Sequence, residues 1–428
     1  MLRGTNKHMD HFNYRNGQLY AEDVSVAEIA ASVGTPFYVY STATLERHFK
    51  LFDDALDGMD HCICYAMKAA SNQAILKTLG NLGAGMDVVS GGEYRRAIAA
   101  GIPPEKVVFS GVGKTLEEIT LALQKGIRQF NVESDSELAQ ISEIASSMGK
   151  IAPIAIRINP DVDAQTHEKI ATGKAENKFG IPLSRAREVY SKASKMPGIS
   201  VVGIDLHIGS QLTDLKPFEE AYQKLADLTQ ILRQDGHKIK RLDLGGGLGI
   251  PYDKNKSAPP LPVEYGKMVR KVLGHLECEI EIEPGRLIVG NAGILVSSVL
   301  GIKNGDNRNF LILDAAMNDL IRPAMYDAYH DIIPVKQPSS VKAVYDVVGP
   351  VCETGDTFAK KRTMPELSEN DLVAFRSAGA YGAVMSSEYN TRPLIPEVMV
   401  NKNEFSIIRK RPSYEEIIDR DIIPNWLK

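Results

Sequence analysis

No apolar run in this sequence approaches the roughly 20 residues that a membrane-spanning helix needs, and Met1–Met9 holds no apolar segment of the signal-peptide type. The net charge of −4 offers no basic surface to nucleic acid or to an anionic membrane. Cysteine is scarce, and neither the number nor the spacing of Cys62, Cys64, Cys278 and Cys352 is typical of a disulfide framework or a zinc site. We therefore expect a cytoplasmic protein without a metal site and without nucleic-acid or membrane partners. Met9 is a candidate natural start, with residues 1–8 as a leader.

What the sequence does contain is enough apolar material for a large core. Of its 428 residues, 43% are hydrophobic and 24% charged, which allows one large or two ordinary domains. Short apolar runs typical of strands recur from about residue 60 to residue 290: Ile63–Ala66, Met86–Val89, Val107–Ser110, Gln129–Val132, Ile154–Ile158, Val201–His207, Arg241–Leu244 and Glu279–Glu283. Helical patterns separate most of them: Asn72–Leu82, Gly92–Ala100, Thr115–Gln124, Ser134–Met148, Leu183–Lys195, Phe218–Gln234 and Val263–Leu276. Eight strands alternating with helices predict a parallel sheet, either a closed (β/α)8 TIM-type barrel or an open doubly wound sheet.

Polar side chains gather at the carboxyl end of nearly every predicted strand. They are Lys68, Ser90, Ser110, Glu133, Arg157–Asn159, His207, the glycines after Leu244, and Glu283. In a barrel the carboxyl ends of all the strands open at one mouth, where active sites are built. The pattern therefore favours the barrel and predicts an active site at its mouth.

After about residue 290 the sequence changes in character. Short β-rich runs are separated by turns rich in Gly, Pro, Asn and Asp: Leu295–Leu300, Phe310–Leu313, Val341–Val348, Leu372–Arg376, Glu397–Val400 and Glu404–Arg409. This predicts a separate, mainly antiparallel β domain. The first forty residues do not start the barrel cleanly, and we expect them to join the β domain. The predicted organisation is residues 1–40 with the β domain, 41–290 as the barrel, and 291–428 as the rest of the β domain.

Lys68 ends the apolar run Cys62–Met67, where a lysine needs an explanation. One is that its ammonium snorkels from the strand end to solvent. The other is that the ammonium is desolvated, which depresses its pKa and yields a nucleophilic amine. Such an amine forms Schiff bases with aldehydes, above all with pyridoxal phosphate. Lys68 is therefore a candidate catalytic residue.

Three further groups suit such a cofactor, although each has a structural alternative. The glycine-rich Gly245–Gly249 suits a phosphate, or else only a tight turn. Glu283 suits a protonated ring nitrogen and Arg286 a phosphate or carboxylate; the alternative is an ion pair between the two. His207 suits stacking on a planar ring, with Ser210 offering a hydroxyl to phosphate, or else a hydrogen-bonded core position.

Several segments together resemble the fold-type III pyridoxal-phosphate decarboxylases, which share an alanine-racemase-like barrel and a β domain. In the barrel they are Tyr65–Ala69, Gly85–Glu93, Asn177–Gly180, His207–Gln211, Gly245–Gly249 and Glu283–Arg286. In the β domain, Asp314–Asp327, Gly349–Asp356 and Gly379–Asn390 narrow the resemblance to the diaminopimelate decarboxylases. The match runs in order over nearly the whole chain after about residue 12. It departs at Ala70, Ala316 and Glu388, none of which belongs to a group that does the chemistry.

The resemblance implies a role for each matching residue. Lys68 would bind pyridoxal phosphate covalently, Glu283 would pair with the ring nitrogen, and His207 would back the ring. Ser210, Gly246, Gly247, Gly285 and Arg286 would complete the cofactor site. The substrate-binding residues would be Arg286, Arg322, Tyr326, Glu353 and Tyr381, of which Tyr381 would also contact the cofactor. Cys352 would donate a proton, reaching with Glu353 into the neighbouring subunit's barrel in a homodimer.

The implied reaction converts meso-2,6-diaminopimelate to L-lysine and carbon dioxide, the last step of bacterial lysine synthesis. Arg322 and Glu353 agree with it, because this substrate carries a second carboxylate and a second ammonium far from the reacting carbon. One alternative is a related decarboxylase of ornithine, arginine or carboxynorspermidine, whose diamine-type substrates would want acids alone. Another is a non-catalytic homologue, which should have lost Lys68, Cys352 or the glycine loop. A racemase is disfavoured because that chemistry favours an arginine in place of Glu283.

Overall fold

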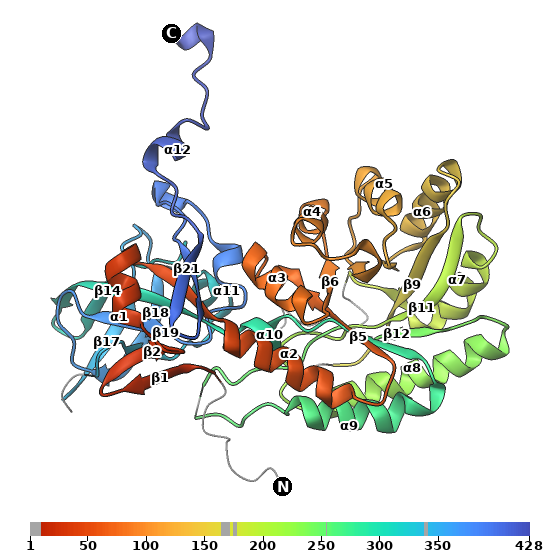
Figure 1. Ribbon diagram of the computed structural model, residues 1–428, viewed down its shortest axis with the longest axis horizontal. Helices are drawn as coiled ribbons and strands as arrows, with labels where there is room; N and C mark the ends of the chain where they lie inside the picture. The colour runs from red at the N-terminus through yellow and green to blue at the C-terminus, as the bar shows by residue number, and fades with distance from the viewer. Residues whose placement is uncertain (1–9, 164–171, 174–177, 254, 338–340) are drawn as a thin grey trace. The chain divides into compact units, whose positions relative to one another are not determined.

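The structure, a computed structural model, describes residues 10–163, 172–173, 178–253, 255–337 and 341–428. The chain divides into two compact units, Glu46–Ile288 and Met1–Leu45 with Val289–Lys428, whose helices and strands are labelled in Figure 1. In the described part of the chain, no helix combines the length and the apolar character that crossing a bilayer requires.

The unit Glu46–Ile288 is a closed barrel. Around it the strands follow the order β5 (His61–Ala66), β6 (Gly85–Val88), β7 (Val107–Phe109), β8 (Gln129–Val132), β9 (Ala152–Asn159), β11 (Ile199–Asp205), β12 (Arg241–Asp243) and β13 (Glu279–Ile282). All neighbouring pairs are parallel, and β13 pairs with β5, so these eight strands of the described residues close the ring. The short β10 (Ile181–Pro182) pairs with β9. The predicted (β/α)8 barrel is confirmed.

Helices connect the barrel strands and lie around them (Figure 1). They are α3 (Gln73–Asn81), α4 (Gly91–Ala99), α5 (Leu116–Lys125), α6 (Asp135–Ser147), α7 (Ala186–Ala193), α8 (Lys216–Gln234) and α9 (Pro262–Leu273). Their starts follow from local chemistry: Thr115 and Glu118 form a capping box at α5, and the Ser134 hydroxyl accepts from the Glu137 amide at α6. These caps satisfy amides that have no partner inside the helix. Each helix therefore begins at the carboxyl end of a strand, beside the barrel mouth.

The other unit is built on a sheet whose strands lie far apart in the sequence. Its main path is β18 (Thr357–Pro365), β17 (Lys342–Val348), β15 (Asn309–Leu313), β14 (Gly293–Asn304), β4 (Phe37–Ser41), β20 (Glu397–Asn401) and β21 (Glu404–Arg409). β19 (Leu372–Phe375) pairs with β14 and with β16 (Ile332–Pro334). β4 lies between β14, to which it is antiparallel, and β20, to which it is parallel. The expectation that the N-terminal segment joins the mainly antiparallel β domain is confirmed.

Several elements of this unit were not expected from the sequence. They are β1 (Phe12–Arg15), β2 (Gln18–Ala21), β3 (Val24–Ser25), α1 (Val26–Val33), β16, β18 and α11 (Arg322–Tyr326). The clearest case is β18, which contains the charged run Lys360–Arg362 yet pairs with β17 along most of its length. Strand formation here depends on pairing with a neighbour, and the composition of the segment alone does not reveal it. The helix α2 (Thr42–Leu56), which precedes the first predicted barrel strand, was also not predicted.

Candidate active site

Lys68 lies just beyond β5, in the 3-10 turn Met67–Ala69. Its side chain is 42% exposed, and its Nζ lies 3.4 Å from Oδ2 of Asp87. Of the two explanations for Lys68, the exposure agrees with a side chain that reaches from the strand end to solvent and not with a desolvated amine, because the turn carries the side chain out of the buried strand. The amine meets a carboxylate at the barrel mouth rather than an apolar environment.

Asp87 is a charged neighbour of Lys68 that was not singled out from the sequence. It occupies the third position of β6, its side chain is fully buried, and its Oδ1 accepts no hydrogen bond from the described residues. A buried carboxylate is costly unless a cation balances it, so Asp87 and Lys68 stabilise each other's charge. The available signal was an aspartate between Met86 and Val88 in a strand that is otherwise apolar. The contact with Asp87 places the Lys68 amine beside β6.

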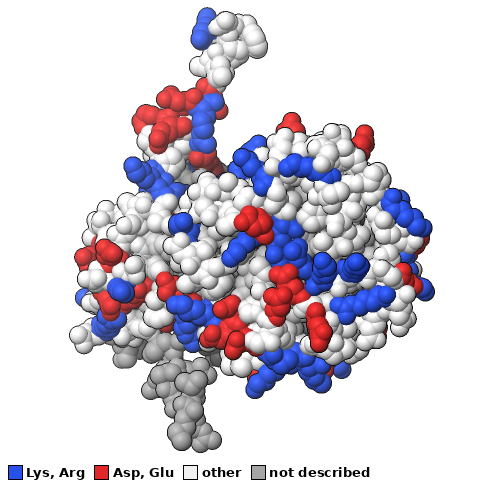
Figure 2. All heavy atoms as spheres, turned by 45° about the vertical axis from the view of Figure 1, so that its right-hand side comes forward, with Lys and Arg blue, Asp and Glu red and all other residues white. Residues whose placement is uncertain are grey.

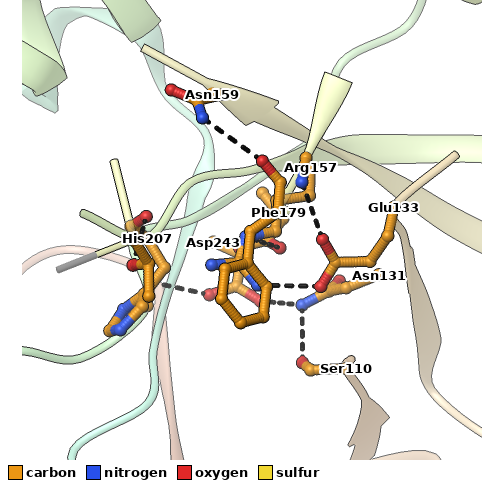
Figure 3. A network of polar contacts seen from close by, with 12 residues as sticks. Ser110, Asn131, Glu133, Arg157, Asn159, Phe179, His207 and Asp243 are labelled. Atoms are coloured by element: carbon orange, nitrogen blue, oxygen red, sulfur yellow. Dashed lines mark hydrogen bonds and ion pairs between the residues drawn. The ribbon is translucent and has the colours of Figure 1, made fainter. Parts of the chain in front are cut away.

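Glu283, directly after β13, is held inside the mouth by hydrogen bonds. Its Oε1 accepts from Ser110 Oγ at 3.2 Å and from Asn131 Nδ2 at 3.3 Å. Asn131 also donates to Asp243 Oδ2 at 2.9 Å, a contact drawn in Figure 3 together with Ser110. The carboxyl ends of β7, β8, β12 and β13 thus meet in one polar network. Asn131 and Asp243 were not singled out from the sequence, because each lies within an apolar-looking strand.

The carboxyl groups at the mouth are buried close to one another, and their pKa values are raised as a result. Burial raises the pKa of Glu283 well above its usual value; Asp87 and Asp205 raise it further, whereas Lys68 lowers it. Burial likewise raises the pKa of Asp243, with Glu283 adding to the effect. The pKa of Asp205 is raised to about 7 by burial, although the charge of Arg157 opposes the rise. The mouth is therefore short of positive charge, and a cation beside Glu283 would favour its ionised form.

Arg157, at the carboxyl end of β9, is a further cation held at the mouth. Its Nη1 donates to Glu133 Oε1 at 2.8 Å, and Glu133 Oε2 accepts from the Gly180 amide at 2.8 Å (Figure 3). The guanidinium lies over the Phe179 ring, 4.8 Å from its centroid. These contacts fix Phe179–Gly180 against β9; Asn177, quoted in the same sequence motif, lies outside the described residues. Glu133 and Arg157 are thereby placed at the mouth as expected.

His207 follows β11 as a partly buried, neutral ring. Burial lowers its pKa well below the usual value, and the positive charges of Arg157 and Lys68 lower it further. Its Nδ1 accepts a hydrogen bond from the Gly246 amide at 3.2 Å, so the ring proton is on Nε2. A neutral ring held in one orientation suits stacking against a planar group.

The glycine run after β12 is required by close packing. A Cβ on Gly246 would lie 2.3 Å from the carbonyl oxygen of Glu283, and one on Gly247 would lie 2.5 Å from the carbonyl oxygen of Gly209. Gly245 and Gly247 also have φ values of 61° and 117°, which side chains disfavour. The run therefore lets the loops after β11, β12 and β13 approach one another. The close packing agrees with both interpretations of Gly245–Gly249, the phosphate site and the tight turn, because both need glycine at these positions.

Ser210 and Arg286 lie together beside this loop. Arg286 is buried, and it donates from Nη2 to Ser210 Oγ at 3.0 Å and from Nη1 to the Tyr252 hydroxyl at 2.6 Å. Glu283 accepts its hydrogen bonds from Ser110 and Asn131, whereas Arg286 donates to Ser210 and Tyr252, which favours separate roles for the two residues over a Glu283–Arg286 ion pair. A guanidinium with two hydroxyls is a donor set that suits phosphate. Tyr252 was missed, having no motif around it.

In the β unit, Arg322 and Tyr326 are the first and last residues of α11. Four residues apart on a helix, they face the same side. Arg322 is buried and its Nη1 donates to His330 Nε2 at 2.8 Å, while His330 Nδ1 donates to the carbonyl oxygen of Arg376 at 3.0 Å. The guanidinium is therefore held in place by a hydrogen-bonded chain within its own unit.

Cys352 and Glu353 lie in a loop that is hydrogen-bonded to Tyr389 and Asn390. The Tyr389 hydroxyl donates to Glu353 Oε2 at 3.0 Å, and the Cys352 amide donates to Asn390 Oδ1 at 3.4 Å. The Cys352 side chain is exposed. Tyr381 has a φ of 56°, a left-handed conformation that is uncommon for a bulky residue and is a reason to suspect a functional constraint.

A second cluster, outside this site, joins Cys62 and Cys64 of β5 to Glu281 of β13. Their ligand atoms lie within 4.8 Å of one another, with the two sulfurs 3.8 Å apart. Glu281 is already paired, since its Oε2 accepts from Arg128 Nε at 2.6 Å. The cation beside Glu281 disfavours a metal there, and this cluster takes no part in the site at the mouth.

Comparison with known proteins agrees with this geometry. The family described as "Pyridoxal-dependent decarboxylase, pyridoxal binding domain" matches residues 42–290. The chain is 50% identical over 419 residues to the diaminopimelate decarboxylase of Zymomonas mobilis, covering 97% of this chain and 99% of that protein. It is 52% identical over 405 residues to that of Vibrio cholerae, covering 94% and 96% respectively. The chain belongs to the diaminopimelate decarboxylase family.

Solved structures extend the family relationship to the fold. The crystal structure of Helicobacter pylori diaminopimelate decarboxylase complexed with L-lysine is 42% identical to this chain, with a TM-score of 0.89. The match covers 92% of this chain and 98% of the Helicobacter pylori chain. The resemblance read from the sequence is therefore confirmed over both units of the chain.

The residues of this family member fit pyridoxal phosphate, the cofactor class that the family description names. Arg286, Ser210 and Tyr252 form a donor set for a phosphate. Glu283 is a buried carboxyl whose neighbours are acidic, so it suits a protonated ring nitrogen. The Lys68 amine is accessible at the same mouth. The expectation of this cofactor is confirmed at the level of the family.

Proposed function

We propose that this chain catalyses the decarboxylation of meso-2,6-diaminopimelate to L-lysine and carbon dioxide with pyridoxal phosphate bound at the barrel mouth. One observation carries the proposal: an accessible lysine, a buried glutamate and a neutral histidine converge at that mouth in a chain about half identical to diaminopimelate decarboxylases over nearly its full length. The direct test is carbon dioxide release from meso- and LL-diaminopimelate, ornithine and arginine. Release from the meso compound alone is expected, and its absence from cofactor-loaded protein would refute the proposal.

The chain's own residues have separable tasks. Lys68 binds the cofactor through its amine, and Asp87 orients that amine. Glu283 holds a negative charge against the ring nitrogen, while His207 presents the face of its neutral imidazole. Arg286 and Ser210 bind the phosphate together with Gly246, Gly247 and Gly285. When bound, pyridoxal phosphate supplies a carbonyl that bonds to amines and a ring that accepts the electron pair left when carbon dioxide departs.

The far end of the substrate sets the specificity. It carries a carboxylate and an ammonium, for which Arg322 and Glu353 are the complementary groups, and Tyr326 and Tyr381 are the other residues assigned to substrate binding. Arg322 is preorganised by His330, so little side-chain freedom is lost when a carboxylate binds. A diamine-type substrate offers no carboxylate at its far end, so the contact between Arg322 and the substrate is not made, which rejects such substrates strongly.

Replacing Arg322 tests this specificity. Arg322→Met should lower kcat/KM for meso-diaminopimelate about 10²- to 10⁴-fold, since two charge-assisted hydrogen bonds of about 1.5–3 kcal/mol each are lost. Steady-state kinetics are the measurement, with visible absorbance to verify that the cofactor remains bound. Arg322→Lys, which keeps the charge, should recover part of the loss. An unchanged kcat/KM in the Met variant would remove Arg322 from the substrate site.

The remaining groups act between two subunits of a homodimer. Cys352 donates the proton that replaces carbon dioxide on the reacting carbon, and with Glu353 it reaches into the barrel of a second copy of the chain. The exposed thiol and the hydrogen bond from Tyr389 to Glu353 support a loop built to meet another surface. The enzyme acts in the cytoplasm, a reducing compartment consistent with free thiols at Cys62, Cys64, Cys278 and Cys352.

Subunit mixing tests the shared site. Lys68→Ala and Cys352→Ala should each be nearly inactive alone, whereas dissociating and reassociating the two together should restore about one quarter of wild-type activity, because half the dimers are mixed and each has one intact site. Carbon dioxide release before and after mixing is the measurement. If both residues served the same chain's site, the mixture would stay inactive.

A further inference from the structure

The end of the chain exposes an unusual concentration of large apolar side chains. Ile422 is 89% exposed, Ile423 64%, Trp426 85% and Leu427 70%, and Ile418 just before them is 62% exposed. Residues 422–427 carry no charge, and Trp426 is the only tryptophan in the sequence. Figure 2 shows charged atoms gathered about α12 (Tyr414–Ile418) and a largely uncharged stretch beyond it. We refer to residues 418–427 as the C-terminal arm. Singly exposed apolar residues are ordinary, whereas a contiguous exposed set indicates a binding surface.

Polar contacts order the segment leading into the arm, so its apolar side chains are not needed for that purpose. Ser413 and Glu416 form a capping box at the start of α12. Upstream, Arg411 donates to the carbonyl oxygen of Pro36 at 2.9 Å, which ties the segment to the N-terminal part of its own unit. Within the arm, Arg420 Nη2 lies 2.7 and 2.6 Å from the two carboxylate oxygens of Glu388. The arm is thus anchored by charge and capped by hydrogen bonds, while its apolar surface is left uncovered.

The Arg420–Glu388 contact joins the arm to the loop that carries the reacting thiol. Glu388 is followed directly by Tyr389, which donates to Glu353, and by Asn390, which accepts from the Cys352 amide. Three consecutive residues therefore contact the arm, Glu353 and Cys352 in turn. A second protein surface that contacts Cys352 and Glu353 would therefore also lie next to the arm.

We propose that the C-terminal arm docks through its apolar side chains on the second copy of this chain, and that through Glu388 it holds the Cys352–Glu353 loop in that copy's site. The proposal rests on the proposed function, in which Cys352 and Glu353 act in the partner's barrel. A second copy is the occupant that this continuity favours, because the loop and the arm are linked side by side on one surface. Burial of several large apolar side chains at the edge of that interface stabilises the dimer.

The single tryptophan provides a test without any substitution. If the arm docks on a second copy, the emission of Trp426 in the cofactor-loaded protein should shift to longer wavelength on dilution, in step with dissociation measured by sedimentation. Emission that stays the same across the dissociation range overturns the proposal. Two other states of the arm would give this constant emission. An arm packed on its own chain would keep Trp426 buried at every concentration, and an arm that binds a different protein would keep Trp426 exposed at every concentration.

Variants test the energetic role. A chain ending at Asp421, and Trp426→Ala in the full chain, should each raise the dimer dissociation constant about tenfold or more, and Trp426→Phe should restore most of the affinity. Ile151→Ala is the control, since Ile151 is 63% exposed but precedes β9, at the opposite end of the barrel strands. Activity of the shortened chain should fall on dilution and recover at high protein concentration. An unchanged dissociation constant in the variants overturns the role of the arm in the dimer. Inactivity of the full chain on diaminopimelate at every concentration instead overturns the proposed function, and sedimentation would still report whether the arm stabilises the dimer.

Discussion

Lys68→Ala should abolish the visible absorbance of protein-bound pyridoxal phosphate and lower carbon dioxide release from meso-diaminopimelate by about 10³-fold or more, because no other amine replaces the covalent attachment. The structure gives a specific reason for the size of the effect. Lys68 Nζ is 3.4 Å from Asp87, which fixes the amine at the mouth occupied by Glu283 and His207. An amine supplied from solvent would lack this placement.

The matched control is Lys77→Ala, an exposed lysine on α3 that removes the same charge. It should leave absorbance and activity unchanged. Asp87→Asn is an informative second variant: as a positioning change it should keep the covalent bond but alter the pH profile of the absorbance. Retention of full activity in Lys68→Ala would disprove the assignment.

Glu283→Gln should lower kcat about 10²- to 10³-fold, the range seen when one electrostatic contact to developing charge is removed. Glutamine can still accept the hydrogen bonds from Ser110 and Asn131 at the oxygen that now accepts them. It cannot balance a positive ring nitrogen, so the electron-accepting state of the cofactor is lost while the packing remains. Glu277→Gln, at an exposed residue before β13, is the control and should be silent.

The same substitution should not destabilise the protein without cofactor at neutral pH. The pKa of Glu283 is raised on folding by burial and by Asp87 and Asp205, so its neutral form is the one that the fold favours. A raised pKa contributes stability that is complete below the unfolded value, about 4.3, and that is lost as the pH rises toward the folded value. Glutamine avoids this loss. Thermal unfolding of the cofactor-free proteins should therefore show the variant equal to or more stable than wild type at pH 7, with the difference vanishing below about pH 4. A variant less stable at pH 7 would contradict this electrostatic account.

The barrel was predictable because its signals are local. Short apolar runs ended in polar residues, and caps such as Thr115 and Ser134 marked where helices begin. Glu283 and His207 could be chosen as candidates for the same reason, since each follows a recognisable strand. The chemical environment of Lys68 could not be predicted, because it depends on Asp87, which is on a different strand and looks like an interruption of an apolar run.

By itself, the sequence determined the alternation of strands and helices, the placement of polar groups at strand ends, and the family to which the motifs belong, since each depends on residues close together in the chain. Only the tertiary structure decided which groups meet. Ser110 and Glu283 are 173 residues apart and share a hydrogen bond, and Phe37–Ser41 fills a gap between β14 and β20. The apolar C-terminal arm was not singled out from the sequence, because its exposure and its contact with Glu388 depend on the folded β unit. Such pairings are set by strand register and packing across the whole molecule, which no local pattern contains.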